Sequence, residues 1–211
     1  MPRAGRPATP LITRQTASDA ALKLIDRHGL DGLSLQGVAR ELGVSAPSLY
    51  HHFKDKEEIL TEVVRRMLEE IGAEQDTWSD DWETRTIELS LATRRVMLRH
   101  PNGAPLALRF FPRKLMLPAY ERSLIDCPYS PEAQAVILEA VEKFTYGTSL
   151  FAAAAEAHHV PAMPTVDAGR FPRLAHALKV APGDDEAIHV EALKALLDGF
   201  RVRFGSKLAK D

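Results

Sequence analysis

Apolar side chains recur at steps of three and four residues along nearly the whole chain, and this spacing constrains the fold more than any other feature of the sequence. It is the period of one face of an α-helix. The period-two alternation that indicates a strand is absent from the sequence. Of the 211 residues, 45% are hydrophobic, which is enough for a packed core. The sequence therefore predicts an all-α fold.

The same apolar residues argue against a membrane protein. No apolar run approaches the roughly 20 residues that span a bilayer, and the basic start at residues 1–7 is followed by no apolar signal segment. The single cysteine, Cys127, cannot form a disulfide within the chain, which fits a reducing compartment. We expect a cytoplasmic protein that does not enter the membrane, with a disordered tail at residues 1–10.

Charge is distributed unevenly along the chain. Residues 1–56 carry eight Lys or Arg against five Asp or Glu, whereas the remainder carries 19 against 24. A polyanion such as double-stranded DNA would therefore be met by the first quarter of the molecule. A basic terminus can also be only a solvated tail, but together with the helical pattern of this segment the asymmetry predicts a DNA-binding domain at residues 1–56 and a second, helical domain at residues 57–211.

The first quarter has the punctuation of three short helices. The first helix ends at Gly29, and the second begins after the natural N-cap Ser34 and ends at Gly43. The third begins after Ser45 and has Pro47 in its first turn, the turn that tolerates a missing amide hydrogen. Two short helices joined by a glycine-containing turn form a helix-turn-helix, whose second helix enters the major groove of DNA.

The third predicted helix supplies polar groups for DNA. Leu49 and Phe53, four residues apart, are expected to face inward. The side chains left facing outward offer hydroxyl and imidazole groups, and they are Ser48, Tyr50 and His52. Lys56, just past this helix, adds a cation for phosphate. In the alternative interpretation Tyr50 and Phe53 are core aromatics, and His51 and His52 are merely solvated.

All strong signals beyond the first quarter are again helical. The fourth helix begins at Asp55 and extends about seventeen residues or more toward Trp78. Further helices are predicted at residues 82–99, 105–111, 115–125, 130–158, 171–180 and 184–204. The two longest carry small residues that permit close helix approach, namely Gly147, Ala152–Ala155, Ala192, Ala195 and Gly199. We expect these two helices to form a four-helix bundle in a homodimer, although the same residues would suit internal packing.

The helical body has more bulky side chains than a thin layer of helices needs, which predicts a ligand pocket. The apolar residues concerned are Phe110, Phe111, Leu115, Met116, Phe144 and Phe151. The polar side chains of His100, Arg109 and His158 are candidates for holding the ligand in this pocket. The predicted ligand-binding residues are therefore His100, Arg109, Phe110, Phe144, Phe151 and His158. In the alternative interpretation the aromatic side chains are simply core and the polar ones face water.

The segment from Gly32 to Lys56 has a specific arrangement of residues. It contains a Leu-Gly-Val turn at residues 42–44, a Leu-Tyr pair at 49–50, an aromatic residue at Phe53 and a closing lysine. In this arrangement the segment resembles the DNA-binding signature of the tetracycline-repressor (TetR) family. Weaker similarity to that family extends to residues 99–104, 144–147 and 196–200. The resemblance implies a homodimer that represses a palindromic DNA operator until a small-molecule effector binds.

The resemblance also implies which residues contact DNA. They are Ser34, Gln36, Ala46, Pro47, Ser48, Tyr50, His52 and Lys56. Gln36 stands where the tetracycline repressor reads a base with an arginine, which implies a different operator sequence. The magnesium-tetracycline site is not matched, because Gly72, Leu89 and Ala107 stand at the positions of its histidine, asparagine and second histidine. We therefore expect an effector of another kind, and no cofactor.

Two Glu-x-x-His steps leave a second class of function open, a metal-dependent enzyme built as a helical bundle. They lie at residues 156–159 and 186–189, and di-iron carboxylate bundles use this step twice. Such a site also needs a glutamate from each of two further helices, and no glutamate interrupts the apolar stripes of the fourth and fifth helices. His-Glu-x-x-His, Gly-x-Ser-x-Gly and Gly-rich phosphate motifs are absent from the sequence. We expect no catalytic or metal-binding residues, and favour a ligand-responsive transcriptional regulator over an enzyme.

Overall fold

The computed structural model describes residues 12–73, 78–111, 113–161, 163, 165–181 and 183–205. Every regular element in this part of the chain is helical, which confirms the predicted all-α fold. The elements are α1 (Arg14–His28), a 3-10 turn η1 (Leu30–Gly32), α2 (Leu35–Glu41), α3 (Ala46–Tyr50), α4 (Lys56–Gly72), α5 (Trp82–Arg99), α6 (Leu106–Arg109), α7 (Arg113–Ser123), α8 (Pro131–Ala157), α9 (Pro172–Lys179) and α10 (Asp185–Phe204). The predicted tail at residues 1–10 lies outside the described residues.

Local capping explains where the helices of the first quarter begin and end. Ser34 caps α2 by accepting a hydrogen bond from the amide of Gly37, and Gly43 has a φ of 67°, the left-handed conformation predicted for it. By contrast, α3 is shorter than the two turns expected from the sequence. Its backbone leaves the helix in a tight turn, because the amides of His52 and Phe53 both donate to the carbonyl of Leu49.

Gly37 lies inside α2, where glycine costs about 0.5–1 kcal/mol relative to alanine, and packing explains its presence. A Cβ atom at this position would lie 3.1 Å from Ser34 Oγ and 3.4 Å from Leu24 Cδ1. The missing side chain therefore lets α2 pack closely on α1 while the capping hydrogen bond of Ser34 is kept.

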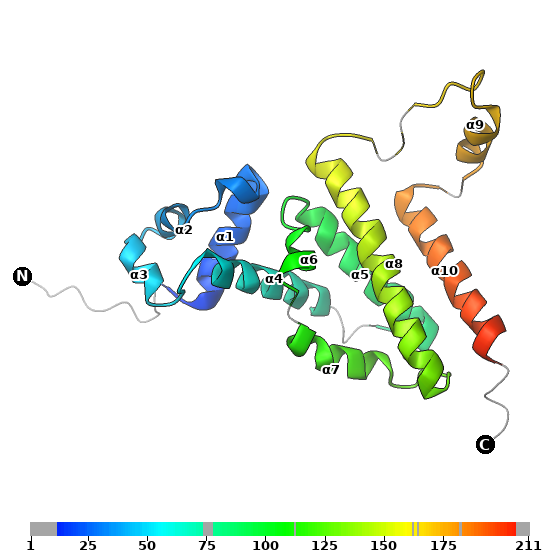
Figure 1. The fold of residues 1–211 in the computed structure, drawn as a ribbon, viewed down its shortest axis with the longest axis horizontal. Coiled ribbons are helices and arrows are strands. Elements are labelled where there is room, and N and C mark those ends of the chain that lie inside the picture. The colour runs from blue at the N-terminus through cyan, green and yellow to red at the C-terminus, as the bar shows by residue number, and fades with distance from the viewer. Residues whose placement is uncertain are drawn as a thin grey trace, which may run out of the picture.

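α4 connects the helix-turn-helix to the rest of the molecule (Figure 1). Its buried stripe belongs to the first of two hydrophobic cores, which also includes side chains of α1, α2, α5 and α6. The stripe consists of Ile59, Leu60, Val63, Val64, Met67 and Ile71. The core is thus continuous across residues 56 and 57, where the sequence analysis divides the chain into domains. That division stays a prediction.

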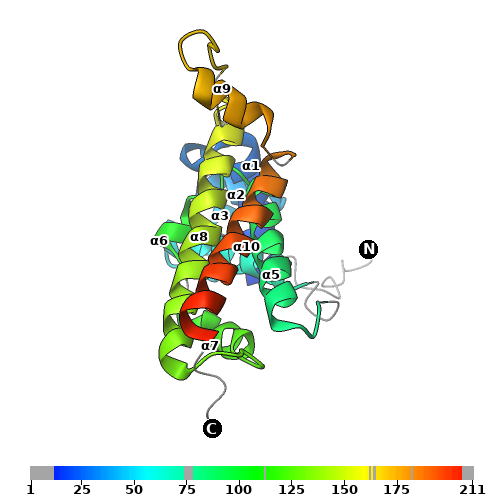
Figure 2. The ribbon, with the colours of Figure 1, turned by 90° about the vertical axis from the view of Figure 1, so that its right-hand side faces the viewer.

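The helical body is built on α5, α8 and α10, which pack together (Figure 1). A second core fills the space between them near the end of α10, and Trp82, Leu193 and Phe200 are among its buried residues. Figure 2 looks onto the side remote from the helix-turn-helix, where α8 and α10 lie next to each other and α9 projects beyond them. In the described part of the chain, no helix combines the length and the apolar character needed to cross a membrane.

Candidate nucleic-acid interface and ligand cavity

α3 is fixed by its apolar face and presents polar groups on the opposite face. Leu49 and Phe53 are buried in the first core, as their spacing predicts. Tyr50 is 56% exposed, which excludes the alternative in which it is a core aromatic. His52 is exposed as well, whereas Ser48 is half-buried and shares a 2.7 Å hydrogen bond with the hydroxyl of Ser45.

The remaining predicted DNA contacts lie next to α3. Ser34 and Gln36 are exposed at the start of α2, and Pro47 is exposed in the first turn of α3. Ala46 is half-buried and packs against the first core. Lys56 is exposed at the start of α4, with its Nζ 3.4 Å from the carbonyl oxygen of Leu30. All eight residues therefore lie on α2 or at its N-cap, on α3, in the turn after α3 or at the first residue of α4. Their contact with DNA stays a prediction.

Arg14 holds the end of α3 against α1 and α4, a role that the sequence analysis missed. Its guanidinium lies 4.7 Å from the centroid of the Phe53 ring and donates to the carbonyl of His52 at 2.9 Å and to Glu58 at 2.8 Å. Glu58 also accepts from the backbone amide of Lys54. The Lys54 amide and then Arg14 lower the pKa of the Glu58 carboxyl. From the sequence alone, Arg14 is only one base in a basic terminus.

His100 joins three helices at the junction between the two parts of the molecule. It follows α5 and is 8% exposed. Its Nδ1 lies 2.8 Å from Asp26 Oδ2 on α1, and its Nε2 lies 3.3 Å from Glu70 Oε2 on α4. Burial lowers the pKa of His100, but the hydrogen bonds and charges of Asp26 and Glu70 outweigh it, so that the pKa is raised above the usual value.

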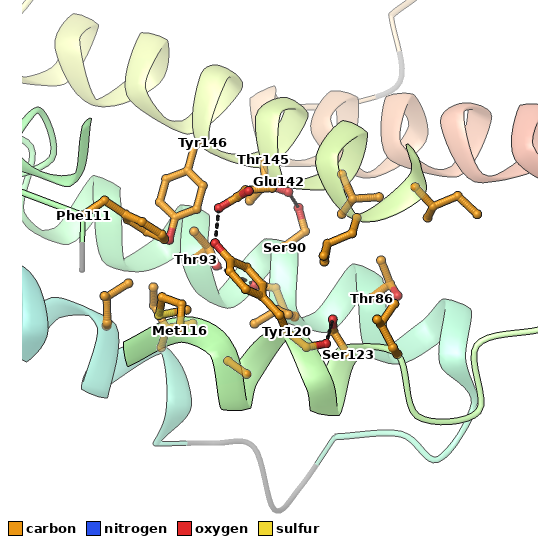
Figure 3. Close-up of a pocket in the computed structure, with 18 of the residues that line it drawn as sticks. Thr86, Ser90, Thr93, Phe111, Met116, Tyr120, Ser123, Glu142, Thr145 and Tyr146 are labelled. Atoms are coloured by element: carbon orange, nitrogen blue, oxygen red, sulfur yellow. Dashed lines mark hydrogen bonds between the residues drawn. The ribbon is translucent and has the colours of Figure 1, made fainter. Parts of the chain in front are cut away.

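A cavity of about 130 Å³ lies in the helical body (Figure 3). Its wall is formed by side chains of α4, α5, α7 and α8 together with Phe111, which is near the predicted location among the fifth to eighth helices. Phe111 and Met116, both noted as bulky residues in the sequence, line it. α4 contributes Leu68 and Ile71, so the helix that begins beside α3 also forms part of the cavity wall.

The polar groups of the cavity are mostly hydroxyls. The Tyr120 hydroxyl on α7 donates to Glu142 Oε1 on α8 at 2.6 Å (Figure 3). Burial and the Glu142 carboxylate raise the pKa of Tyr120 well above its usual value, and the same two causes raise the pKa of Tyr146. The hydroxyls of Ser90 on α5 and Thr145 on α8, which also line the cavity, share a 2.7 Å hydrogen bond.

The structure places the six predicted ligand-binding residues elsewhere. None of His100, Arg109, Phe110, Phe144, Phe151 and His158 is among the described residues that line this cavity. His100 lies at the junction described above, and Arg109 forms an ion pair with Glu57 at 2.9 Å. Phe110 packs against the first core and Phe144 against the second. Phe151 and His158 are exposed, and a ligand at any of the six stays a prediction.

The two Glu-x-x-His steps do not meet. Glu156 and His159 are exposed near the end of α8, whereas Glu186 is paired with Arg95 at 2.7 Å. His189 is buried among hydroxyl groups, with Nε2 2.9 Å from Ser90 Oγ and Nδ1 3.0 Å from Thr148 Oγ1. Among the described residues, His, Cys, Asp and Glu side chains form no group of three that could hold a metal ion.

Comparison with known proteins finds a family match for each of the two parts of the chain. Residues 18–63 match the family of bacterial regulatory proteins named tetR, and residues 75–204 match the tetracyclin repressor-like C-terminal domain. The chain is 28% identical to the tetracycline repressor protein class D of Escherichia coli, with 93% of each chain covered.

Solved structures agree with this sequence similarity. A possible TetR family transcriptional regulator from Streptomyces coelicolor A3(2) has a TM-score of 0.70 and 29% identity, over 90% of this chain and 99% of that one. A variant of TetR from Acinetobacter baumannii AYE, solved in complex with minocycline, has a TM-score of 0.69 and 25% identity, over 90% of this chain and 94% of that one.

Proposed function

The chain belongs to the tetR family of bacterial regulatory proteins, and on that premise we propose that it represses transcription from a DNA operator until a small molecule releases it. As a member of this family it is a DNA-binding transcriptional regulator and not an enzyme. The observation that carries the proposal is the orientation of α3 and of the turn after it, which together bury Leu49 and Phe53 and leave Tyr50 and His52 exposed. A DNA operator implies that the protein works in the cytoplasm.

α3 is the proposed recognition helix. Tyr50, His52 and Lys56 would contact phosphates on either side of the groove, and Gln36 on α2 would read a base edge. The other proposed contacts are Ser34, Ala46, Pro47 and Ser48. The Arg14 contacts support this role, because they fix the end of α3 before DNA arrives and so reduce the ordering cost of binding.

The test of DNA binding is in vitro selection of duplexes that the purified full chain retains. We expect a palindromic site, because a twofold dimer presents the same helix to each half-site. Tyr50→Ala should weaken binding to the selected duplex, whereas Leu117→Ala, an exposed apolar position on α7, should leave it unchanged. Failure to retain any duplex at low salt concentration would overturn the proposal.

Regulators of this family act as dimers, and we assign the dimer interface to α8 and α10. On α10, exposed apolar and small residues follow one another at steps of four and three, the spacing of a helix-packing seam. They are Ile188, Ala192, Ala195, Gly199 and Val202. Phe151 on α8 is 84% exposed, and α9 buries none of its residues, so a second copy would cover surface that the single chain leaves open.

A charge in this seam tests the interface. Val202, which is 85% exposed, becomes buried in the proposed dimer, so Val202→Glu should produce monomers in light scattering after size-exclusion chromatography. Leu117→Glu changes an equally apolar exposed position outside the seam and should leave the dimer intact. Dimers of Val202→Glu as stable as those of the unmodified chain would contradict the assignment.

We place the effector in the cavity beside α4. A ligand there contacts Leu68 and Ile71, and it would favour one arrangement of α4 over another. Because α4 begins just after α3, its movement would shift the two recognition helices of a dimer away from the roughly 34–36 Å separation of one DNA turn. The coupling between ligand and DNA would be of the order of 1–3 kcal/mol.

A further inference from the structure

We propose that the cavity takes a small organic cation, with its charged nitrogen against Glu142 and its apolar body against the aromatic wall. The inference rests on the proposed function, because it names the chemical class of the effector that would bind in this cavity. It is carried by three observations: the charge of the cavity wall, the rings that form it and its volume.

Among the described residues that line the cavity, Glu142 is the only charged one, and none is a Lys, Arg or His. Its one hydrogen bond in this part of the chain comes from the neutral hydroxyl of Tyr120. No basic side chain of the described residues lies within ion-pair distance of Glu142, whereas Glu139, three residues earlier on α8, is paired with Lys143. A carboxylate in an apolar wall gains more from a cation than a solvated one does, because water screens it less.

Glu142 lies close to both tyrosines of the wall, since Tyr120 donates to it and Tyr146 is four residues further along α8. Burial raises the pKa of both tyrosines, and the negative charge of Glu142 raises it further. Arg113 acts in the opposite direction on Tyr120, but it is exposed and does not line the cavity. Because Glu142 is the only charged side chain among the described residues of the wall, a positive ligand is favoured in this space over a negative one.

The rings of the wall suit the same ligand. Phe111 and Tyr146 meet edge to face at a centroid distance of 5.5 Å, and Trp82 and Tyr120 also line the cavity. Aromatic faces attract cations and also bury the apolar part of a ligand. The Tyr146 hydroxyl makes no hydrogen bond within the described chain, so its oxygen is available to accept one from an ammonium group.

The volume sets the size of the ligand. At about 130 Å³ the cavity is close to the roughly 150 Å³ of an engineered apolar cavity that binds benzene. A single ring with a short charged arm therefore matches the available space. Benzylammonium, benzyl alcohol and benzoate share this ring and nearly this size, and they differ in charge.

The first experiment titrates the full-length protein with these three compounds by isothermal titration calorimetry. We expect benzylammonium to bind most tightly and benzoate most weakly. Equal or tighter binding of benzoate would overturn the proposal, and so would the absence of binding by all three compounds at millimolar concentration.

Variants then assign the selectivity to one carboxylate. Glu142→Gln keeps a hydrogen-bond acceptor for Tyr120 and removes the charge, and it should weaken benzylammonium binding about tenfold. Unchanged affinity for benzyl alcohol would show that the cavity of the variant is intact. Glu139→Gln, on the same helix but outside the cavity wall, should bind all three compounds like the unmodified chain. Preference for the cation that survives in Glu142→Gln would refute the role of this residue.

Fluorescence anisotropy with a selected DNA duplex separates this inference from the proposed function. Charge-selective binding to the cavity without a change in DNA affinity would support the cation site and contradict the effector role. Release of DNA by benzyl alcohol and benzoate as effectively as by benzylammonium would support the effector role and contradict the cation site.

Discussion

The His100 cluster is predicted to make the stability of the protein depend on pH in a direction that the structure fixes. His100 is buried between Asp26 on α1 and Glu70 on α4, and Arg99 and Arg66 also lie within ion-pair distance of Glu70. The perturbation is His100→Gln, which keeps a polar side chain but cannot become charged. Since three helices meet at this residue, the change acts on the junction between the DNA-binding helices and the helical body.

The magnitude follows from the two hydrogen bonds of His100. A hydrogen bond to a charged group contributes about 1.5–3 kcal/mol. The Asp26 bond, at 2.8 Å, is the shorter one, whereas Glu70 is shared with the exposed Arg99. Glutamine replaces part of one bond, so we expect His100→Gln to lower the free energy of unfolding by about 2 kcal/mol where the histidine is protonated.

The sign of the pH dependence follows from the raised pKa of His100. A group whose pKa is higher in the folded state contributes its full stabilisation below the unfolded-state pKa of about 6.5 and loses it as pH rises through the folded-state value. The difference between the unmodified chain and the variant should therefore be largest near pH 6 and shrink toward pH 9.

Urea unfolding at pH 6 and pH 9 measures this difference directly. His51→Gln, at an exposed position after α3 and outside the cluster, is the matched control for replacing a histidine. The reasoning is refuted if the destabilisation by His100→Gln is the same at both pH values or is larger at pH 9.

Three further predictions concern DNA binding and the second core. Lys56→Ala should weaken binding to all DNA sequences and reduce the slope of log affinity against log salt by about one, the value for a single phosphate, measured by anisotropy; an unchanged slope would exclude a phosphate role for this lysine. Gln36→Ala should relax the preference at one base step in a competition assay, and an unchanged ranking of operator variants would exclude base reading. Leu193→Ala, at a fully buried position, should cost about 2–5 kcal/mol in urea unfolding; a cost below about 1 kcal/mol would mean that the site collapses or admits water.

Much of the fold follows from the sequence because many helix ends are decided locally. Ser34 caps α2 by accepting a hydrogen bond from the amide of Gly37, only three residues further along the chain. Gly43 takes the left-handed conformation in the turn that follows α2. The length of α3 is not decided locally. It ends early because the backbone turns at His52 and brings Phe53 into the core, a requirement set by α1 and α4. The fit of Gly37 against Leu24 likewise depends on a second helix.

The predicted site residues differ in the same way. At α3 the helical spacing of Leu49 and Phe53 predicts correctly that both are buried, although Phe53 reaches the core through the turn that follows the helix. α8 packs against α5 and α10 and also lines the cavity, so neighbouring residues along this helix have different surroundings. Phe144 packs beside His189, whereas the next two residues, Thr145 and Tyr146, line the cavity. The sequence places bulky residues in the correct helices, but the orientation of each is fixed only by how α5, α7 and α10 pack around α8.

The same packing connects the cavity to both ends of the molecule. Ser90 and Thr145 line the cavity, and Ser90 also hydrogen-bonds to His189 on α10, the helix assigned to the dimer interface. Leu68 on α4 also lines the cavity, and α4 begins a few residues after the recognition helix. A ligand that competes for the Ser90 hydroxyl would disturb α10, whereas one that only fills space would push on α4. An effector that does both would change the spacing within the proposed dimer and the position of α3 together, and both changes would favour the proposed release of DNA.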